Sequence, residues 1–585
     1  MKKLIFNIIF IVIVVFCFFM LEILLRVLKV GYSTEPFVLH PQLRQFYIDN
    51  KELRLKYYPR KIDLSRDPIK NIFMAHKPEG LLRGFVIGGS AAEGFPFYSN
   101  HSFSKILEAA LSESGKFKKV EVINLGFSAM SSYYVADVSK KLLKYKPDFV
   151  VIYSGHNEYY GTISATTGGG HLTKKIYLAL KELRFFQLIF EILGRSQWKG
   201  IYSRTMMAEQ FNNRVLPFNE KLDNYVAKCY IKNIDEVIKE FTSKGIHVIW
   251  VEPVCNLIDM PPFKGKNDNK LSNYIVPYYN AIILKKKGDV EKIEKELKGL
   301  SGVSENANFI YLNALKDYYF GHNAKLDGFI EAKDKDLVPF RVRTPIVEAI
   351  KNYMNSHKNQ YLHYIPLQSR IEKNFGSGGF GNNIFIDHLH FNFKGHILMA
   401  GIIAQEIANI YGFGKNERKK VIEFLMDENR IREKIYFTPL NDFVAYRSIL
   451  LLSKQIPYSD MLIKFVPSPD LRNPFLTNKD AYILSEEELF NKVLNEFIEK
   501  KDFKKALFYL NSVLAIYPGE ARNYLAMADL QSMLNQEEAF YNYVLAYVLS
   551  GRKYEYYKKL EDYLISRHQD VMLNKIISMY GKPVK

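Results

Sequence analysis

The chain has 585 residues, more than one compact core accommodates, and therefore predicts several domains. Its composition, 48% hydrophobic and 24% charged, excludes a disordered chain, and three cysteines exclude a disulfide framework. The net charge of +19 comes from lysines scattered over predicted helices, without a basic stripe interleaved with aromatic residues, so we expect no nucleic-acid partner.

Residues 1–30 are predicted to be a transmembrane signal anchor. The run from Leu4 to Leu21 contains one clearly polar side chain, Asn7, and is long enough to cross a bilayer as a helix. No small-residue cleavage site follows, which favours an uncleaved anchor over a removed signal peptide. Lys2 and Lys3 precede the run, so we expect a single-pass protein of the cytoplasmic membrane with the N-terminus inside and the rest of the chain outside. A buried core helix is the alternative.

Residues 31–80 mix prolines with polar and aromatic residues. This composition predicts a juxtamembrane spacer with little regular structure.

A short apolar run then ends abruptly at a serine. Phe85 to Ile87 predicts a buried strand, followed by Gly88-Gly89, by Ser90 and by residues that favour a helix. Ser90 is thereby placed at the carboxyl end of a strand, where open α/β sheets bind ligands. A flexible Gly-Gly-Ser turn is the alternative for this motif on its own.

Three further segments supply partners for such a serine. Residues 120–126 and 148–158 each read as an apolar strand, the first ending at Gly126 and the second running into Asn157. In the segment 382–395, Asp387 stands three residues before His390. Acyl transfer requires a nucleophile, a base, a carboxylate that orients the base, and donors for the oxyanion. Each role has a candidate in these segments.

These segments resemble the blocks of the SGNH hydrolase superfamily, also called GDSL esterases and lipases. The four signature residues of that family correspond to Ser90, Gly126, Asn157 and His390, in the family's order, and Asp387 matches the aspartate of its D-x-x-H block. The resemblance implies a three-layer α/β/α, flavodoxin-like domain with a parallel five-stranded sheet. It also implies a catalytic triad of Ser90, His390 and Asp387, with an oxyanion hole formed by the Ser90 and Gly126 amides and the Asn157 side chain.

The sequence departs from the family pattern at two positions. Gly89 stands where the family has the aspartate of Gly-Asp-Ser, and Glu158 stands where it has the second aspartate of Gly-x-Asn-Asp. Neither residue has an assigned catalytic role, but loss of the first aspartate puts the geometry of the serine turn in doubt.

Helical segments alternate with the predicted strands, which favours a parallel sheet covered on both faces. We assign 81–412 to the hydrolase domain, with further strands at 247–254 and 364–367 and a helical insertion over about 163–345. Within the insertion, Arg341 and Arg343 are candidates to face an anionic substrate, although exposed arginines commonly have no such role.

The last third of the chain is predicted to be helical. Residues 413–480 form a helical extension, and 481–585 resemble tetratricopeptide repeats, with Ala506 and Ala539 separated by 33 positions. Two copies are few for a free-standing array, so this region is expected to lean on the hydrolase domain or on a protein partner. An ordinary pair of helical hairpins is the alternative.

The sequence therefore predicts a serine esterase that acts on an ester-bearing glycan or lipid at the outer face of the membrane. Two alternatives stay open, an O-acyltransferase acting on cell-surface polysaccharide and a catalytically silent scaffold. No cofactor fingerprint is visible. A zinc site among Asp387, His388, His390 and His396 was weighed and set aside, because the D-x-x-H match accounts for two of these residues without a metal. The natural substrate, the oligomeric state and any pairing of Cys229 with Cys255 are not specified by the sequence.

Overall fold

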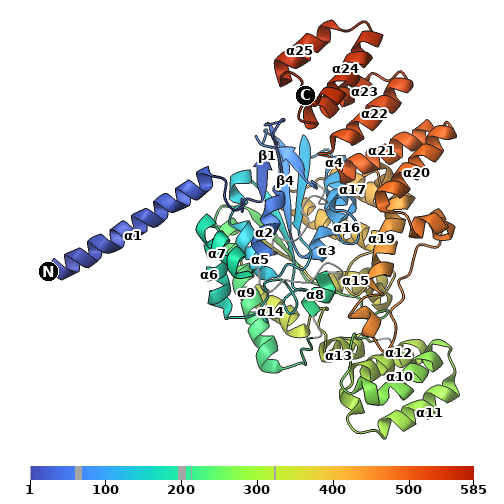
Figure 1. Ribbon diagram of the computed structural model, residues 1–585. Helices are drawn as coiled ribbons and strands as arrows, with labels where there is room; N and C mark the ends of the chain where they lie inside the picture. The colour runs from blue at the N-terminus through green and yellow to red at the C-terminus, as the bar shows by residue number, and fades with distance from the viewer. Residues whose placement is uncertain (1, 59–68, 195–205, 212–213, 322–324, 585) are drawn as a thin grey trace.

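The computed structural model describes residues 2–58, 69–194, 206–211, 214–321 and 325–584 (Figure 1). At its centre lies a parallel sheet of five strands in the order β5-β4-β6-β7-β8. The strands are β4 (Leu81–Gly88), β5 (Lys119–Gly126), β6 (Phe149–Tyr153), β7 (His247–Val251) and β8 (Leu362–Ile365). The prediction of a parallel five-stranded sheet is confirmed.

The strand order reverses at β4. The chain runs from β4 to β5 on one side and then to β6 on the other, as in flavodoxin-like sheets, and open α/β sheets bind ligands at the carboxyl ends of the strands where the order reverses in this way. Gly88 pairs with both Gly126 and Tyr153, so β4, β5 and β6 end at the same level. Residues that follow these three strands are therefore close neighbours.

Helices cover both faces of the sheet. Val86, Val151 and Ile249 pack toward α4 (Phe103–Glu113) and α16 (Phe393–Ile410), whereas Phe85 and Trp250 pack toward the opposite layer. That layer contains α5 (Ser132–Ser139), α9 (Glu220–Thr242) and α14 (Thr344–Ser356). Covering on both faces is why these strands read as continuous apolar runs rather than as alternating ones.

The segment predicted to be an irregular spacer instead contains a small antiparallel sheet, so that prediction is wrong for its described residues; 59–68 lie outside them. The sheet consists of β1 (Phe37–Leu39), β2 (Phe46–Asp49) and β3 (Ile72–Met74), and α2 (Arg54–Tyr57) follows β2. It is fixed to the main domain by aromatic packing, with the rings of Phe37 and Tyr145 5.1 Å apart. The Arg83 guanidinium adds bonds to Glu121 and to the Met74 carbonyl.

Helix α1 (Lys2–Val27) is apolar along most of its length and projects from the body of the molecule (Figure 1). By length and composition it can span a membrane or serve as a signal sequence.

The predicted insertion over 163–345 is two groups of helices rather than one, because α9 and β7 of the main domain lie inside that range. The first group follows β6 and comprises α6 (His171–Leu180), α7 (Arg184–Gly194) and α8 (Met206–Phe211). The second follows β7 and is drawn at the lower right of Figure 1. It comprises α10 (Asp268–Ile283), α11 (Lys287–Lys298), α12 (Ala307–Phe320) and α13 (Asp327–Lys335).

The C-terminal part is helical, as predicted. α17 (Lys415–Met426) and α18 (Glu428–Lys434) pack on α4, and α19 (Pro439–Leu452) and an irregular stretch follow. Each later helix packs on the next along the upper right of Figure 1. These are α20 (Glu486–Glu499), α21 (Phe503–Ile516), α22 (Ala521–Met533), α23 (Glu538–Leu549), α24 (Tyr554–Ser566) and α25 (Val571–Tyr580). Ala506 and Ala539 are both buried, and the repeat assignment stays a prediction.

The C-terminal helices rest on the domain that contains the five-stranded sheet. The Tyr98 hydroxyl donates to Glu486 at 2.6 Å, and the Asn100 side-chain amide donates to the Ala515 carbonyl at 2.6 Å. Both contacts involve the loop between α3 (Ser90–Glu93) and α4.

Candidate active site

Ser90 is the first residue of α3 and lies directly beyond the end of β4. The turn before it requires glycine, because a Cβ at Gly88 would lie 2.0 Å from the Tyr153 carbonyl oxygen. Ser90 is half-buried, so its hydroxyl is held in place while one side stays accessible. The sequence placed it correctly at the carboxyl end of a strand.

Three side chains form a hydrogen-bonded chain that starts at this serine. Ser90 Oγ lies 2.8 Å from His390 Nε2, and His390 Nδ1 lies 2.7 Å from Asp387 Oδ2. With the ring proton on Nδ1, the imidazole donates to Asp387 and its Nε2 accepts from the serine hydroxyl. The structure thus brings together the three residues that the sequence singled out, as a base between a nucleophile and a carboxylate.

Asp387 is itself fixed by the backbone. Its Oδ1 accepts from the amides of Leu389 at 2.9 Å and His390 at 2.8 Å, and the whole side chain is buried. Burial alone would raise its pKa, but the neighbouring rings of His390 and His388 outweigh that effect and hold the pKa of the Asp387 carboxyl well below its usual range. The carboxylate therefore stays ionised and orients the imidazole.

A residue that the sequence analysis missed supports this loop. Asn256, which is buried just after β7, donates from its side-chain amide to the Asp387 carbonyl at 3.1 Å. Arg341 in turn donates to the Asn256 carbonyl at 3.2 Å. Nothing in the local pattern around Asn256 signals this role, because its partner lies 131 positions later.

Asn157 lies against the serine turn. Its Nδ2 donates to the Met130 carbonyl at 3.0 Å, which engages one of the two amide hydrogens. A Cβ at Gly89 would lie 2.5 Å from the same nitrogen. A side chain at position 89 would therefore displace the Asn157 amide.

Gly126 does not offer the amide that the sequence analysis assigned to it. Its N–H donates to Asn124 Oδ1 at 2.7 Å and is thereby engaged. The loop that follows contains Ala129 with φ of 59°, a left-handed conformation that is uncommon for a residue other than glycine. The Ala129 carbonyl accepts from the Thr162 amide at 3.0 Å, which ties this loop to the segment that follows Asn157.

Glu158, the second departure from the family pattern, holds the start of α5. Its carboxylate accepts from the Ser132 amide at 2.7 Å and from the Ser132 hydroxyl at 2.8 Å, and it is fully buried. Burial raises the pKa of Glu158 to about 7. Glu158 therefore fixes the start of α5 relative to the end of β6.

The two arginines considered for an anionic substrate are buried instead. Arg343 pairs with Asp223 at 3.0 Å, and Arg341 donates to the Met260 carbonyl at 2.7 Å and pairs with Asp336. Both guanidiniums brace the interior, so that prediction is wrong.

Of the four residues weighed for zinc, Asp387, His388 and His390 lie close together. Both nitrogens of His390 already face triad partners, and His388 Nδ1 lies 2.7 Å from the Tyr458 hydroxyl. His396 lies apart, and its Nδ1 accepts from the Phe103 amide at 3.3 Å. His390 is therefore the histidine of the group that contacts Ser90, whereas His388 and His396 are bonded to Tyr458 and Phe103.

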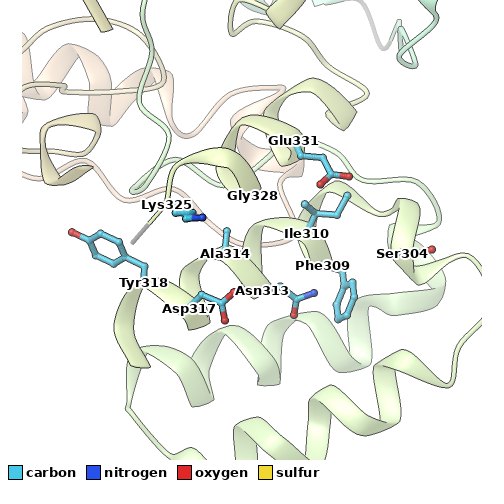
Figure 2. A pocket seen from close by; sticks show the side chains of 10 residues that line it. All are labelled: Ser304, Phe309, Ile310, Asn313, Ala314, Asp317, Tyr318, Lys325, Gly328 and Glu331. Carbon is cyan, nitrogen blue, oxygen red and sulfur yellow. The ribbon is translucent and has the colours of Figure 1, made fainter. Parts of the chain in front are cut away.

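A separate hollow of about 410 Å³ lies between α12 and α13 (Figure 2). Its lining residues all fall within 304–331 and include the charged side chains of Asp317, Lys325 and Glu331. It shares no residue with the triad.

Comparison with known proteins adds little to this geometry. No family model matches the sequence, and no curated protein matches it. A solved structure described as a gut microbial diltiazem-metabolizing enzyme is similar at 12% identity and a TM-score of 0.26, over 87% of this chain and 97% of that one.

Proposed function

We propose that this protein is a serine esterase of the SGNH type, anchored in the cytoplasmic membrane with its catalytic domain outside. The observation that carries the proposal is the hydrogen-bonded chain from Ser90 through His390 to Asp387 at the carboxyl end of β4. The same contacts argue against a catalytically silent scaffold.

The chemistry follows from the geometry. Ser90 Oγ attacks an ester carbonyl while His390 Nε2 takes its proton, and Asp387 stabilises the imidazolium that forms. The imidazolium then protonates the leaving alcohol, which leaves an acyl group on Ser90. Water, activated by the same imidazole, attacks the acyl carbonyl and releases the acid.

The oxyanion is assigned two donors, the Ser90 amide at the start of α3 and the second amide hydrogen of Asn157. Each donor of this kind contributes about 3 kcal/mol to the transition state when it is properly aimed.

The test is replacement of Ser90. Ser90→Ala in the purified full chain is expected to abolish hydrolysis of p-nitrophenyl acetate and labelling by a fluorophosphonate, because no other residue replaces the nucleophile. Ser112→Ala, which alters an exposed serine of α4, serves as the matched control. Unchanged turnover in folded Ser90→Ala would refute the proposal.

A further inference from the structure

The end of α1 is bonded to the start of α7 rather than being a loose tether. The Glu22 carboxylate accepts from the amides of Arg184 at 2.9 Å and Phe185 at 3.1 Å. Arg26 Nε donates to the same carboxylate at 2.8 Å. Negative charge at a helix start is favourable, because the first amides have no partner within the helix. Glu22 therefore fixes where α7 begins relative to α1.

Apolar and backbone contacts extend this junction. The ring of Phe18 in α1 lies 5.3 Å from that of Phe185 and 6.1 Å from that of Phe186. Gln187 pairs in both directions with the backbone of Tyr32, accepting from its amide at 2.9 Å and donating to its carbonyl at 3.2 Å. The first turn of α7 is thus held at the level of Phe18.

That level lies within the thickness of a bilayer. A helix rises about 1.5 Å per residue, so Phe18 is about 21 Å and Glu22 about 27 Å beyond Leu4. The hydrocarbon core is about 30 Å thick. If α1 spans the membrane, the first turn of α7 lies where the acyl chains meet the headgroups.

The surface of α6 and α7 suits that depth. In its eleven residues α7 has two charged side chains, Arg184 and Glu191. α6 runs beside it, with the rings of Tyr177 and Phe190 4.9 Å apart. Four apolar side chains toward one end of this hairpin are exposed, namely Leu172 at 70%, Ile176 at 50%, Ile192 at 62% and Leu193 at 64%. Exposed apolar side chains grouped in this way mark an interaction surface.

We propose that the α6–α7 hairpin, residues 171–194, is a second membrane-embedded element whose partner is the lipid bilayer. This proposal rests on the proposed function, in which α1 spans the membrane. Continuity with α1 selects lipid over a second copy or another protein, because the first turn of α7 is bonded to a helix that itself enters the bilayer and the exposed apolar side chains belong to the same short hairpin. α1 and the hairpin together hold the catalytic domain at a fixed tilt and height above the membrane.

The test measures the depth of a fluorescent label at Ile192→Cys in the full chain. The background is Cys17→Ser, since Cys229 and Cys255 are buried. The protein is reconstituted in phosphatidylcholine vesicles, and quenching by nitroxide-bearing lipid is compared with quenching by iodide in the water. We expect loss of fluorescence with the lipid nitroxide and none with iodide, and unchanged ester turnover as evidence of folding.

Two labels calibrate the result. Leu471→Cys, at an apolar residue that is 85% exposed outside the hairpin, should be quenched by iodide alone. Ile9→Cys, within α1, should be quenched by lipid alone. Iodide quenching at Ile192 equal to that at Leu471 would overturn the proposal, as would protection from both quenchers, which would mean that protein covers the hairpin. Iodide quenching at Ile9 would overturn the membrane placement as well, while ester turnover reports separately on the catalytic assignment.

Discussion

The exchange Asp387→Asn tests the proposed mechanism most sharply, because the structure specifies how the amide must turn. One oxygen of Asp387 accepts two backbone amides, and the other faces His390 Nδ1. An asparagine has a single acceptor oxygen. Keeping the two backbone bonds aims the amide NH₂ at Nδ1, so the ring must carry its proton on Nε2. That tautomer cannot take the proton of Ser90.

The expected magnitude follows from this tautomer change. The corresponding exchange in a serine protease triad lowers kcat by about 10⁴, and a loss of that size equals about 5.4 kcal/mol of transition-state stabilisation. Turning the amide the other way would restore the acceptor at Nδ1 but break two buried backbone bonds, each worth about 1 kcal/mol, and leave their N–H groups unsatisfied. We therefore expect the inactive orientation to predominate.

The assay is hydrolysis of p-nitrophenyl acetate by the purified full chain, with Tm measured on the same samples. Asp480→Asn, an exchange at an exposed aspartate near α20, is the matched control and should leave kcat unchanged. A loss of less than about tenfold in folded Asp387→Asn would refute the reasoning, because the tautomer argument requires far more.

Three further outcomes are expected. Asn157→Ala should lower kcat by about 10² to 10³ with a smaller effect on KM, since an oxyanion donor acts in the transition state; a change confined to KM would contradict that role. Gly89→Ala should also lower kcat, because its Cβ would lie 2.5 Å from Asn157 Nδ2. Gly168→Ala is the control and should leave kcat unchanged, because a Cβ at that position has no atom within 4 Å. Equal activities of the two variants would count against the placement of Asn157. Burial raises the pKa of Glu158 from its ordinary value of 4.5 to about 7, so the folded chain retains a proton across this window after the unfolded chain has lost it. The free energy of unfolding should therefore fall by about 3 kcal/mol as the pH rises from about 4.5 to 7. Denaturant titrations at several pH values should show that Glu158→Gln lacks this fall. The same dependence of unfolding free energy on pH in both proteins would contradict the prediction.

The sequence predicted the sheet well, because both of its faces are covered and its strands therefore stand out as uninterrupted apolar runs such as Phe85 to Ile87. The triad was predictable for the same reason, since Ser90 follows a strand end and Asp387 and His390 form a short local motif. In a parallel sheet the carboxyl ends of all strands lie at the same edge, so residues that follow different strands are expected to lie close together there.

What the sequence did not show depends on contacts between distant segments. Strands β1 to β3 have three or four residues each, too few for a periodic signal, and they are fixed by rings such as Tyr145 that come much later in the chain. The sequence analysis did not foresee that the Gly126 amide is bonded to the side chain of Asn124, two residues earlier. The burial of Arg341 depends likewise on partners elsewhere in the fold.

The base lies 300 positions after the nucleophile. A partly synthesised chain that already contains Ser90 lacks the His390 imidazole, so under the proposed mechanism Ser90 is activated only when the polypeptide has been completed past β8 and has closed around the serine turn. The proposed activity is thereby tied to finished folding of the chain.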